Sequence, residues 1–163
     1  MDVRLIAAIG RRGQLGLEGD MPWGRSFPDD LRRFRELTAG GIVLVGWRTW
    51  PTVERLQGTH GRRFVVDDVK LPPTGMLVRL QEPDASGTRD RPVWIAGGAK
   101  TYARYARFVD EFVVRRVPYD GPADTWMPDL LGTPEADRTD GPYTGRSPTD
   151  KQWRPGCRRL RDR

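Results

Sequence analysis

The sequence predicts an α/β domain with a mostly parallel central sheet flanked by helices. Short apolar runs of the kind that form buried strands alternate with segments of helical periodicity, and glycine-rich loops separate them. With 163 residues the chain is long enough to bury a substantial core, and we expect a single domain.

The N-terminal part of the chain supplies a strand, a long loop and a helix. The apolar run at residues 3–9 predicts a buried strand. Residues 10–23 form a glycine-rich loop that is longer than a simple turn, which favours a functional role. A helix is predicted from Pro28, whose missing N–H costs nothing at a helix start, to a glycine stop at residues 39–41.

The rest of the first 129 residues continues the alternation. Residues 42–45 and 63–66 are predicted as buried strands, and residues 76–80 as a weaker one. Further strands are predicted at residues 93–96 and 111–117. From residue 130 onward the chain is rich in glycine, proline, arginine and aspartate and has almost no apolar alternation, which is typical of loops or poorly ordered segments.

An acidic residue, Asp30, lies one turn into the predicted first helix, directly after a Met-Pro-Trp loop at residues 21–23. The apolar face of this helix is made by three side chains: Leu31, Phe34 and Leu37. Desolvation among apolar groups favours the neutral form of an acid, so Asp30 can hold or relay a proton near neutral pH. The alternative is structural, because an acid favours the positive end of a helix dipole, and Asp29 or Ser26 could cap the helix.

Two glycines, Gly97 and Gly98, follow a predicted strand and open a helix that extends through Tyr105. Without Cβ atoms the backbone can approach a pyrophosphate, and the helix start offers free N–H groups to it. Tight packing between the strand and the helix is the structural alternative.

Composition narrows the classes of function. The formal net charge is +6, but the basic residues are mostly arginines scattered among acids, with no nucleic-acid-binding motif, so attraction of small polyanions is favoured over nucleic-acid binding. The single cysteine, Cys157, excludes an internal disulfide, and together with the single histidine, His60, it makes a zinc site improbable. No apolar run is long enough to cross a membrane and no secretory signal is evident. The lone cysteine fits a reducing cytoplasm, so we expect a cytoplasmic protein, and we expect it to be a monomer.

Several motifs together resemble the dihydrofolate reductase family. Residues 15–38, LGLEGDMPWGRSFPDDLRRFRELT, are similar to its Met-Pro-Trp loop and first helix, and residues 5–8 are similar to its first strand. Residues 95–102, IAGGAKTY, are similar to its Gly-Gly motif, and residues 124–128, DTWMP, to its Asp-Thr-x-Phe-Pro segment. The resemblance implies a reductase domain over residues 1–129. In residues 130–163 we find no convincing strands for the family's closing hairpin, and we expect a poorly ordered segment or a degenerate hairpin.

The resemblance implies reduction of dihydrofolate to tetrahydrofolate by hydride transfer from NADPH. Asp30 would assist protonation, with Met21 and Trp23 in the loop that closes the site. The substrate would contact six residues: Ile6, Ala7, Leu31, Phe34, Val53 and Arg62. Of these, Arg62 would pair with the glutamate carboxylate, a bidentate geometry suited to guanidinium.

The resemblance also implies a set of residues at the cofactor: Ala8, Gly16, Leu17, Gly46, Arg48, Thr49, Ala96, Gly97, Gly98, Ala99, Lys100, Tyr102 and Thr125. Two departures concern the adenosine 2′-phosphate. Trp47 occupies the usual arginine place, and Asp67 and Asp68 stand where the family often has serine and arginine. Acids repel a phosphate and can accept a hydrogen bond from a free ribose hydroxyl. We therefore expect NADPH to be preferred over NADH by a reduced margin.

Two further positions bear on activity. Arg115 falls where the family has a threonine beside the catalytic acid, and a cation there is expected to lower the pKa of Asp30. Asp124 is expected to brace the Met21 loop through backbone N–H groups. Two alternatives stay open: a reductase of another pterin or of a pyrimidine precursor of flavins, and a degenerate, non-catalytic homologue that binds folate or nucleotide.

Overall fold

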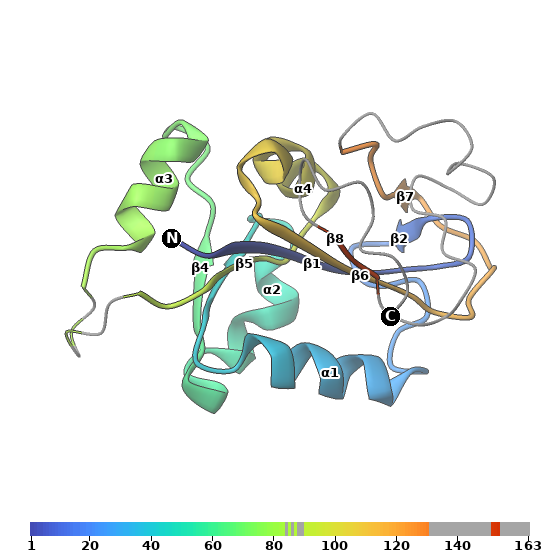
Figure 1. Cartoon of the computed structure of the whole chain (residues 1–163). Coiled ribbons are helices and arrows are strands. Elements are labelled where there is room, and N and C mark those ends of the chain that lie inside the picture. Colours follow the sequence, from blue (N-terminus) through green and yellow to red (C-terminus); the bar gives the residue numbers. More distant parts are fainter. Residues whose placement is uncertain (84, 86, 88–89, 131–150, 154–163) are drawn as a thin grey trace.

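The structure is built on one large sheet. The computed structural model describes residues 1–83, 85, 87, 90–130 and 151–153. In this part of the chain, six strands form the main sheet in the order β4-β3-β5-β1-β6-β8, and β2 pairs with β7 in a separate ribbon (Figure 1). The strands are β1 Val3–Ile9, β2 Gln14–Gly16, β3 Ile42–Val45, β4 Arg63–Val66, β5 Val93–Ile95, β6 Glu111–Arg116, β7 Thr125–Trp126 and β8 Lys151–Trp153. The helices are α1 Pro28–Thr38, α2 Trp50–Val53, α3 Pro73–Leu80 and α4 Ala99–Tyr105, with short 3-10 turns at Glu54–Leu56, Thr59–Gly61 and Ala106–Phe108.

The main sheet is mostly parallel, which confirms the predicted α/β class. Strand β1 pairs in parallel with β5 and β6, and β3 pairs in parallel with β4 and β5. Only β8 is antiparallel, and it pairs with β6. Parallel strands need crossover connections, and the helices supply them.

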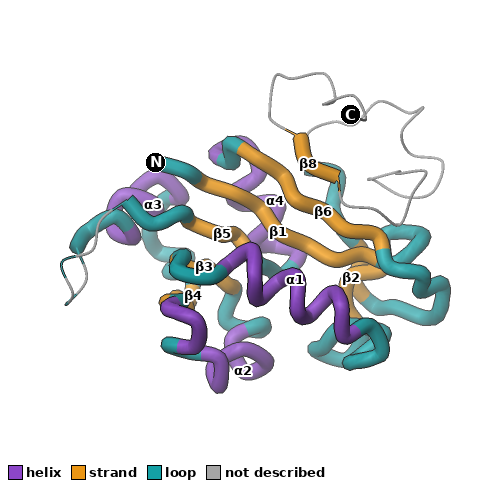
Figure 2. The backbone as a smooth tube through the Cα atoms, turned by 60° about the horizontal axis from the view of Figure 1, so that its bottom comes forward, coloured by secondary structure: helices purple, strands orange, loops and turns teal. Residues whose placement is uncertain are grey.

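Helices cover both faces of the sheet, as Figure 2 shows. Apolar side chains of α1 and α2 pack on one face, against a core that comprises Ile6, Val43, Val45, Phe64, Trp94 and Val113. Helices α3 and α4 pack on the other face, against the larger core, which includes Leu5, Ile9, Leu44, Ile95 and Phe112. Successive residues of a strand point to opposite faces of the sheet and so contribute to the two cores in turn, as expected for a sheet that is buried on both faces.

Strands β1 and β5 lie side by side at first and then separate. Their register runs from Val3↔Val93 to Leu5↔Ile95, whereas β1 stays paired with β6 as far as Ile9↔Arg116. The chain leaves β1 toward α1 on one face and leaves β5 toward α4 on the other. A switch of this kind opens a ligand site beyond the carboxyl ends of parallel strands.

The first helix begins at Pro28, as predicted, and ends at Thr38. Neither proposed cap is used, because the N-cap residue is Phe27 and no side chain makes a capping hydrogen bond. Asp29 instead pairs with Arg32 one turn later, at 2.9 Å between Oδ1 and Nη2.

The prediction of a strand at residues 76–80 is wrong, because this segment is part of α3. Met76, Leu77 and Leu80 all point into the core, a spacing that suits one face of a helix. A short apolar run does not separate helix from strand by itself, and Pro73 in the first turn favours the helix.

Some elements were not predicted. The ribbon of β2 and β7 is too short for a recognisable alternation, and α2 is a single turn. In the polar C-terminal segment, for which a poorly ordered segment or a degenerate hairpin was expected, β8 at Lys151–Trp153 adds an antiparallel edge strand. The expectation for the rest of that segment, residues 131–150 and 154–163, lies outside the described residues.

Candidate functional site

Asp30 is a buried carboxylate on α1, with 8% of its surface exposed. Burial raises the pKa of Asp30, and this effect is larger than the opposing effects of the Arg115 and Arg33 charges. The expected lowering effect of Arg115 is thus present, but the desolvation that was also expected outweighs it, so the net shift is upward. The sequence identified the opposing cation but could not weigh it against the loss of solvent.

The register expected for Arg115 agrees with the structure. Residue 115 pairs with Ala8 of β1. It is two positions beyond Val113, whose side chain lies in the core under α1, so the strand alternation directs Arg115 to the same face. Its charge acts on Asp30 and on Arg33 of the same helix. Two cations thus accompany the buried acid.

The apolar residues expected at the substrate differ in how they are placed. Ile6 belongs to the core under α1, and Phe34 and Val53 are half-buried at its edge. Leu31 is 38% exposed and lies in neither core, so its apolar side chain is presented on the exposed side of α1. The side chain of Ala7 packs in the core on the opposite face, which leaves its backbone as the part that can face a ligand on the α1 side.

Arg62 is buried next to Phe34, and only 3% of the residue is exposed. Its guanidinium carbon lies 6.0 Å from the Phe34 ring centroid and 5.2 Å from that of Phe64. Nε and Nη2 donate to the backbone and hydroxyl oxygens of Thr59, at 3.0 and 2.6 Å. Nη1 is buried without a hydrogen-bond partner among the described residues. Because arginine stays charged, that nitrogen is a ready donor for an anion.

The loop that contains Met21 and Trp23 is tied to the segment between β6 and β7. The Trp23 ring is buried, and its centroid lies 5.6 Å from that of Tyr119. The Asp124 carboxylate accepts a hydrogen bond from the Glu18 backbone N–H at 2.8 Å, the kind of brace that was expected. This bond is the largest cause of the lowered pKa of Asp124.

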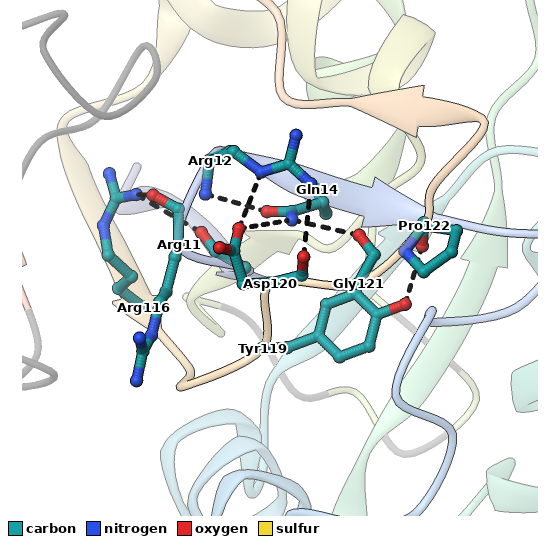
Figure 3. Close-up of polar contacts among 9 residues, drawn as sticks. Arg11, Arg12, Gln14, Arg116, Tyr119, Asp120, Gly121 and Pro122 are labelled. Atoms are coloured by element: carbon teal, nitrogen blue, oxygen red, sulfur yellow. Dashed lines mark hydrogen bonds and ion pairs between the residues drawn. The ribbon is translucent and has the colours of Figure 1, made fainter.

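A polar network holds the base of the same loop, as Figure 3 shows. Gln14 is fully buried; its side-chain oxygen accepts from the Arg12 backbone N–H at 2.8 Å, and its amide nitrogen donates to the Gly121 carbonyl at 3.2 Å. Arg12 pairs with Asp120 at 2.6 Å, and this contact is the main cause of the lowered pKa of Asp120. Arg116 donates to the backbone oxygens of residues 10 and 11.

The glycines expected at the cofactor meet at the carboxyl edge of the sheet. The Gly46 N–H donates to the Gly97 carbonyl at 2.7 Å, which joins the loops after β3 and β5. A Cβ added to Gly46 would lie 2.7 Å from Thr101 Oγ1, and one added to Gly98 would lie 3.4 Å from Thr49 Oγ1. Gly97 is buried and Gly46 and Gly98 are half-buried, so the missing side chains let the two loops and the start of α4 pack closely. The same lack of bulk fits a dinucleotide that must approach the backbone closely.

Tyr102 lies at the point where β1 and β5 separate. Its hydroxyl donates to the Ile6 carbonyl at 2.8 Å across the gap in the register. Burial and then the Asp30 charge raise the pKa of Tyr102. The contact and the electrostatic coupling place Tyr102, Ile6 and Asp30 in one neighbourhood.

The remaining residues expected at the cofactor fall into two groups. Ala8, Ala96, Ala99 and Lys100 lie around the same strand ends, and Arg48 is exposed after β3, with its guanidinium carbon 5.1 Å from the Trp47 ring centroid. The second group is in the β2–β7 ribbon and the turn next to it, and it comprises Gly16, Leu17 and Thr125.

The two acids after β4, which were expected to act alike on a 2′-phosphate, differ in their surroundings. Asp67 is buried, accepts a 2.6 Å hydrogen bond from the Tyr105 hydroxyl and lies 3.0 Å from Arg104 Nε. Asp68 is only partly buried. This difference could not be predicted from the sequence, because it depends on partners in α4.

The sequence also gave no role to Gln14, Tyr119 or Asp120, which position the Met21 loop. Their only signal is a polar residue inside a short strand and a Pro-Tyr-Asp-Gly turn, which are common features. The described residues contain no helix long and apolar enough to cross a membrane and no group of three or more metal-ligating side chains.

Comparison with known proteins agrees with the fold and the motifs. A family model described as dihydrofolate reductase matches residues 2–135. A dihydromethanopterin reductase from Methylorubrum extorquens strain AM1 is 34% identical over 133 residues, which cover 78% of this chain and 90% of that protein. Dihydrofolate reductase type 9 from Escherichia coli is 26% identical over 135 residues, which cover 76% of this chain and 74% of that protein.

A solved structure is similar over most of the chain. Dihydrofolate reductase from Enterococcus faecalis, complexed with NADP(H) and RAB-propyl, aligns with a TM-score of 0.63 and 19% identity, covering 81% of this chain and 80% of that chain. At this identity the similarity concerns the fold.

Proposed function

This chain belongs to the dihydrofolate reductase family, and from that premise we propose that it reduces dihydrofolate to tetrahydrofolate with a hydride from NADPH. The observation that carries the proposal is Asp30, a carboxylate that is 8% exposed and is electrostatically coupled to Tyr102, at the separation of β1 and β5. A buried acid with a raised pKa next to an opening in a parallel sheet is suited to proton chemistry on a bound ring.

The reaction adds a hydride to C6 of the pterin and a proton to N5. A bound reduced nicotinamide supplies the hydride. Asp30 holds a proton at higher pH than an ordinary aspartate does, because burial disfavours its charged form. The Met21 loop, held by the Trp23–Tyr119 contact and by Asp124, excludes water from the ring.

Two features of this chain favour folate as the substrate. The pterin end of the substrate would meet Asp30. Phe34 is four residues after Asp30, about 6 Å further along the axis of α1, and Arg62 lies beside the Phe34 ring. The buried Nη1 of Arg62 is a donor without a partner among the described residues, and it suits a substrate that carries a carboxylate on its tail. The glycines at residues 46, 97 and 98, with Thr49, would hold the dinucleotide.

A second candidate is the reduction of another dihydropterin. The observation that favours it is the relative named dihydromethanopterin reductase, which is 34% identical and covered over 90% of its length. Asp30 would serve either substrate, whereas Arg62 distinguishes substrates by their tails.

The test is the steady-state oxidation of NADPH by the full chain, with dihydrofolate and, separately, with a dihydropterin that has no glutamate tail. We expect oxidation that requires a pterin and a lower KM for dihydrofolate. Faster turnover of the tailless pterin at equal concentration would favour the second candidate. Absence of turnover with every dihydropterin would contradict the proposal.

A further inference from the structure

The two acids that follow β4 lie at the same sheet edge as the glycine loops. Strands β3 and β4 are parallel neighbours that end at Val45↔Val66, and the Asp67 N–H donates to the Val45 carbonyl at 2.8 Å. The loop after β3 is tied in turn to Gly97. Since neighbouring strands are about 4.8 Å apart, the acids lie about 10 Å from the Gly97 loop along the edge.

That distance suits the adenosine half of a dinucleotide whose nicotinamide lies at the β1–β5 separation. In parallel sheets, an acid at the end of a strand beside the first crossover hydrogen-bonds a free ribose 2′-hydroxyl, and a cation accommodates a 2′-phosphate. The residues at the end of β4 are therefore placed to read this group. This step rests on the proposed function, since it takes the dinucleotide to bind here.

The Asp67 side chain is buried and has its partners inside the protein. Only 3% of its side chain is exposed, one carboxylate oxygen accepts from Tyr105, and the other lies 3.0 Å from Arg104 Nε. Arg104 also donates to the Leu71 carbonyl, so the Asp67–Arg104 pair attaches the loop after β4 to helix α4. A neutralised and enclosed carboxylate neither repels nor binds a ligand at the surface.

Asp68 has the opposite character. Its side chain is 40% exposed, and one carboxylate oxygen lies 3.7 Å from Arg79 Nη1, on a side chain that is 62% exposed. An exposed pair at that distance is weak. Oδ1 accepts one hydrogen bond from the Lys70 backbone N–H at 3.1 Å, and a carboxylate has further lone pairs. Asp68 thus keeps both its charge and its capacity to accept from a hydroxyl.

We propose that Asp68 is the specificity-determining residue for the adenosine ribose, that it reduces the preference for the 2′-phosphate of NADP(H) relative to the 2′-hydroxyl of NAD(H), and that Asp67 has no part in this choice. The structure supports the distinction through the different exposure and partners of two adjacent carboxylates. Removal of the Asp68 charge also takes away the carboxylate that lies 3.7 Å from Arg79, which leaves that cation better able to attract a phosphate.

The test measures dissociation constants of NAD⁺ and NADP⁺ by titration calorimetry, in the wild-type protein and in the variants Asp68→Ser, Asp68→Asn and Asp67→Ser. Both affinities come from the same preparation, so their ratio does not depend on the folded fraction. We expect each Asp68 variant to shift the ratio toward NADP⁺ by about tenfold or more at low salt, and by less at high salt.

Asp67→Ser is the matched control. It is expected to lower the thermal stability of the protein and to leave the ratio within about twofold of wild type, the scale below which affinity differences are small. An unchanged ratio in both Asp68 variants, or an equal shift in Asp67→Ser, would overturn the inference about Asp68 and leave the proposed function standing. Failure of the wild-type protein to bind either dinucleotide would overturn the proposed function together with it.

Discussion

Replacement of Arg62 by alanine gives a prediction that the structure makes quantitative. The guanidinium is 3% exposed, is fixed by two hydrogen bonds to Thr59, and keeps Nη1 without a partner. A substrate carboxylate that meets this group forms a desolvated, charge-assisted pair. Truncation of one partner of such a pair costs about 2–4 kcal/mol, which corresponds to an increase of about 30- to 900-fold in Kd for dihydrofolate.

The assay is direct binding of dihydrofolate and of a dihydropterin that has no glutamate tail, each to wild type and to Arg62→Ala. The tailless ligand is the internal control, because loss of the Thr59 contacts disturbs both ligands equally. Arg63→Ala is the matched control variant, since Arg63 Nη2 donates to the Leu80 carbonyl at 3.3 Å, on the α3 side of the sheet. We expect it to leave both affinities unchanged. Equal losses for the two ligands in Arg62→Ala would show that Arg62 does not pair with the glutamate carboxylate.

Three further predictions concern the acid, its cation and the cofactor edge. Because burial raises the pKa of Asp30, its ionisation costs stability as pH rises through that pKa. Asp30→Asn should therefore have a higher Tm than wild type at neutral pH, by a margin that shrinks toward about pH 4. Arg115→Thr removes an effect that lowers the pKa of Asp30, so the loss of kcat with rising pH should move to higher pH; an unmoved profile would place Arg115 outside the site. Gly46→Ala should cost about 1–3 kcal/mol in unfolding free energy through overlap with Thr101 Oγ1, and adding Thr101→Ala should recover most of it; no recovery would show another cause.

The main lines of the fold could be predicted because hydrophobic periodicity sets them. The apolar runs that became β1, β3 and β4 were found with the same bounds as in the structure, and α1 starts at Pro28 as expected. The run at Met76 was misassigned, since five apolar-rich residues fit a strand as well as a helix face. The β2–β7 ribbon was missed because its strands are too short to show a period.

The relative placement of some candidate residues could be predicted from the sequence, but their electrostatics could not. The position of Arg115 followed from counting along a strand, because the side-chain period of two is rigid. The net pKa direction of Asp30 depends on how much water the fold excludes, and the inward turn of Asp67 depends on Tyr105 and Arg104 in α4. Those quantities arise from tertiary contacts, and a single sequence does not contain them in readable form.

The central claim is that Asp30 supports proton delivery to a dihydropterin. It is tested most directly by the single-turnover rate of dihydrofolate reduction at neutral pH in wild type, Asp30→Asn and Asp29→Asn. Asp29 is the control, because it is the adjacent acid of α1 but is exposed and paired with Arg32. We predict a loss of about 100-fold or more in Asp30→Asn, the scale of lost general acid–base catalysis, and a wild-type rate in Asp29→Asn. A wild-type rate in Asp30→Asn, or an equal loss in both variants, would contradict the account.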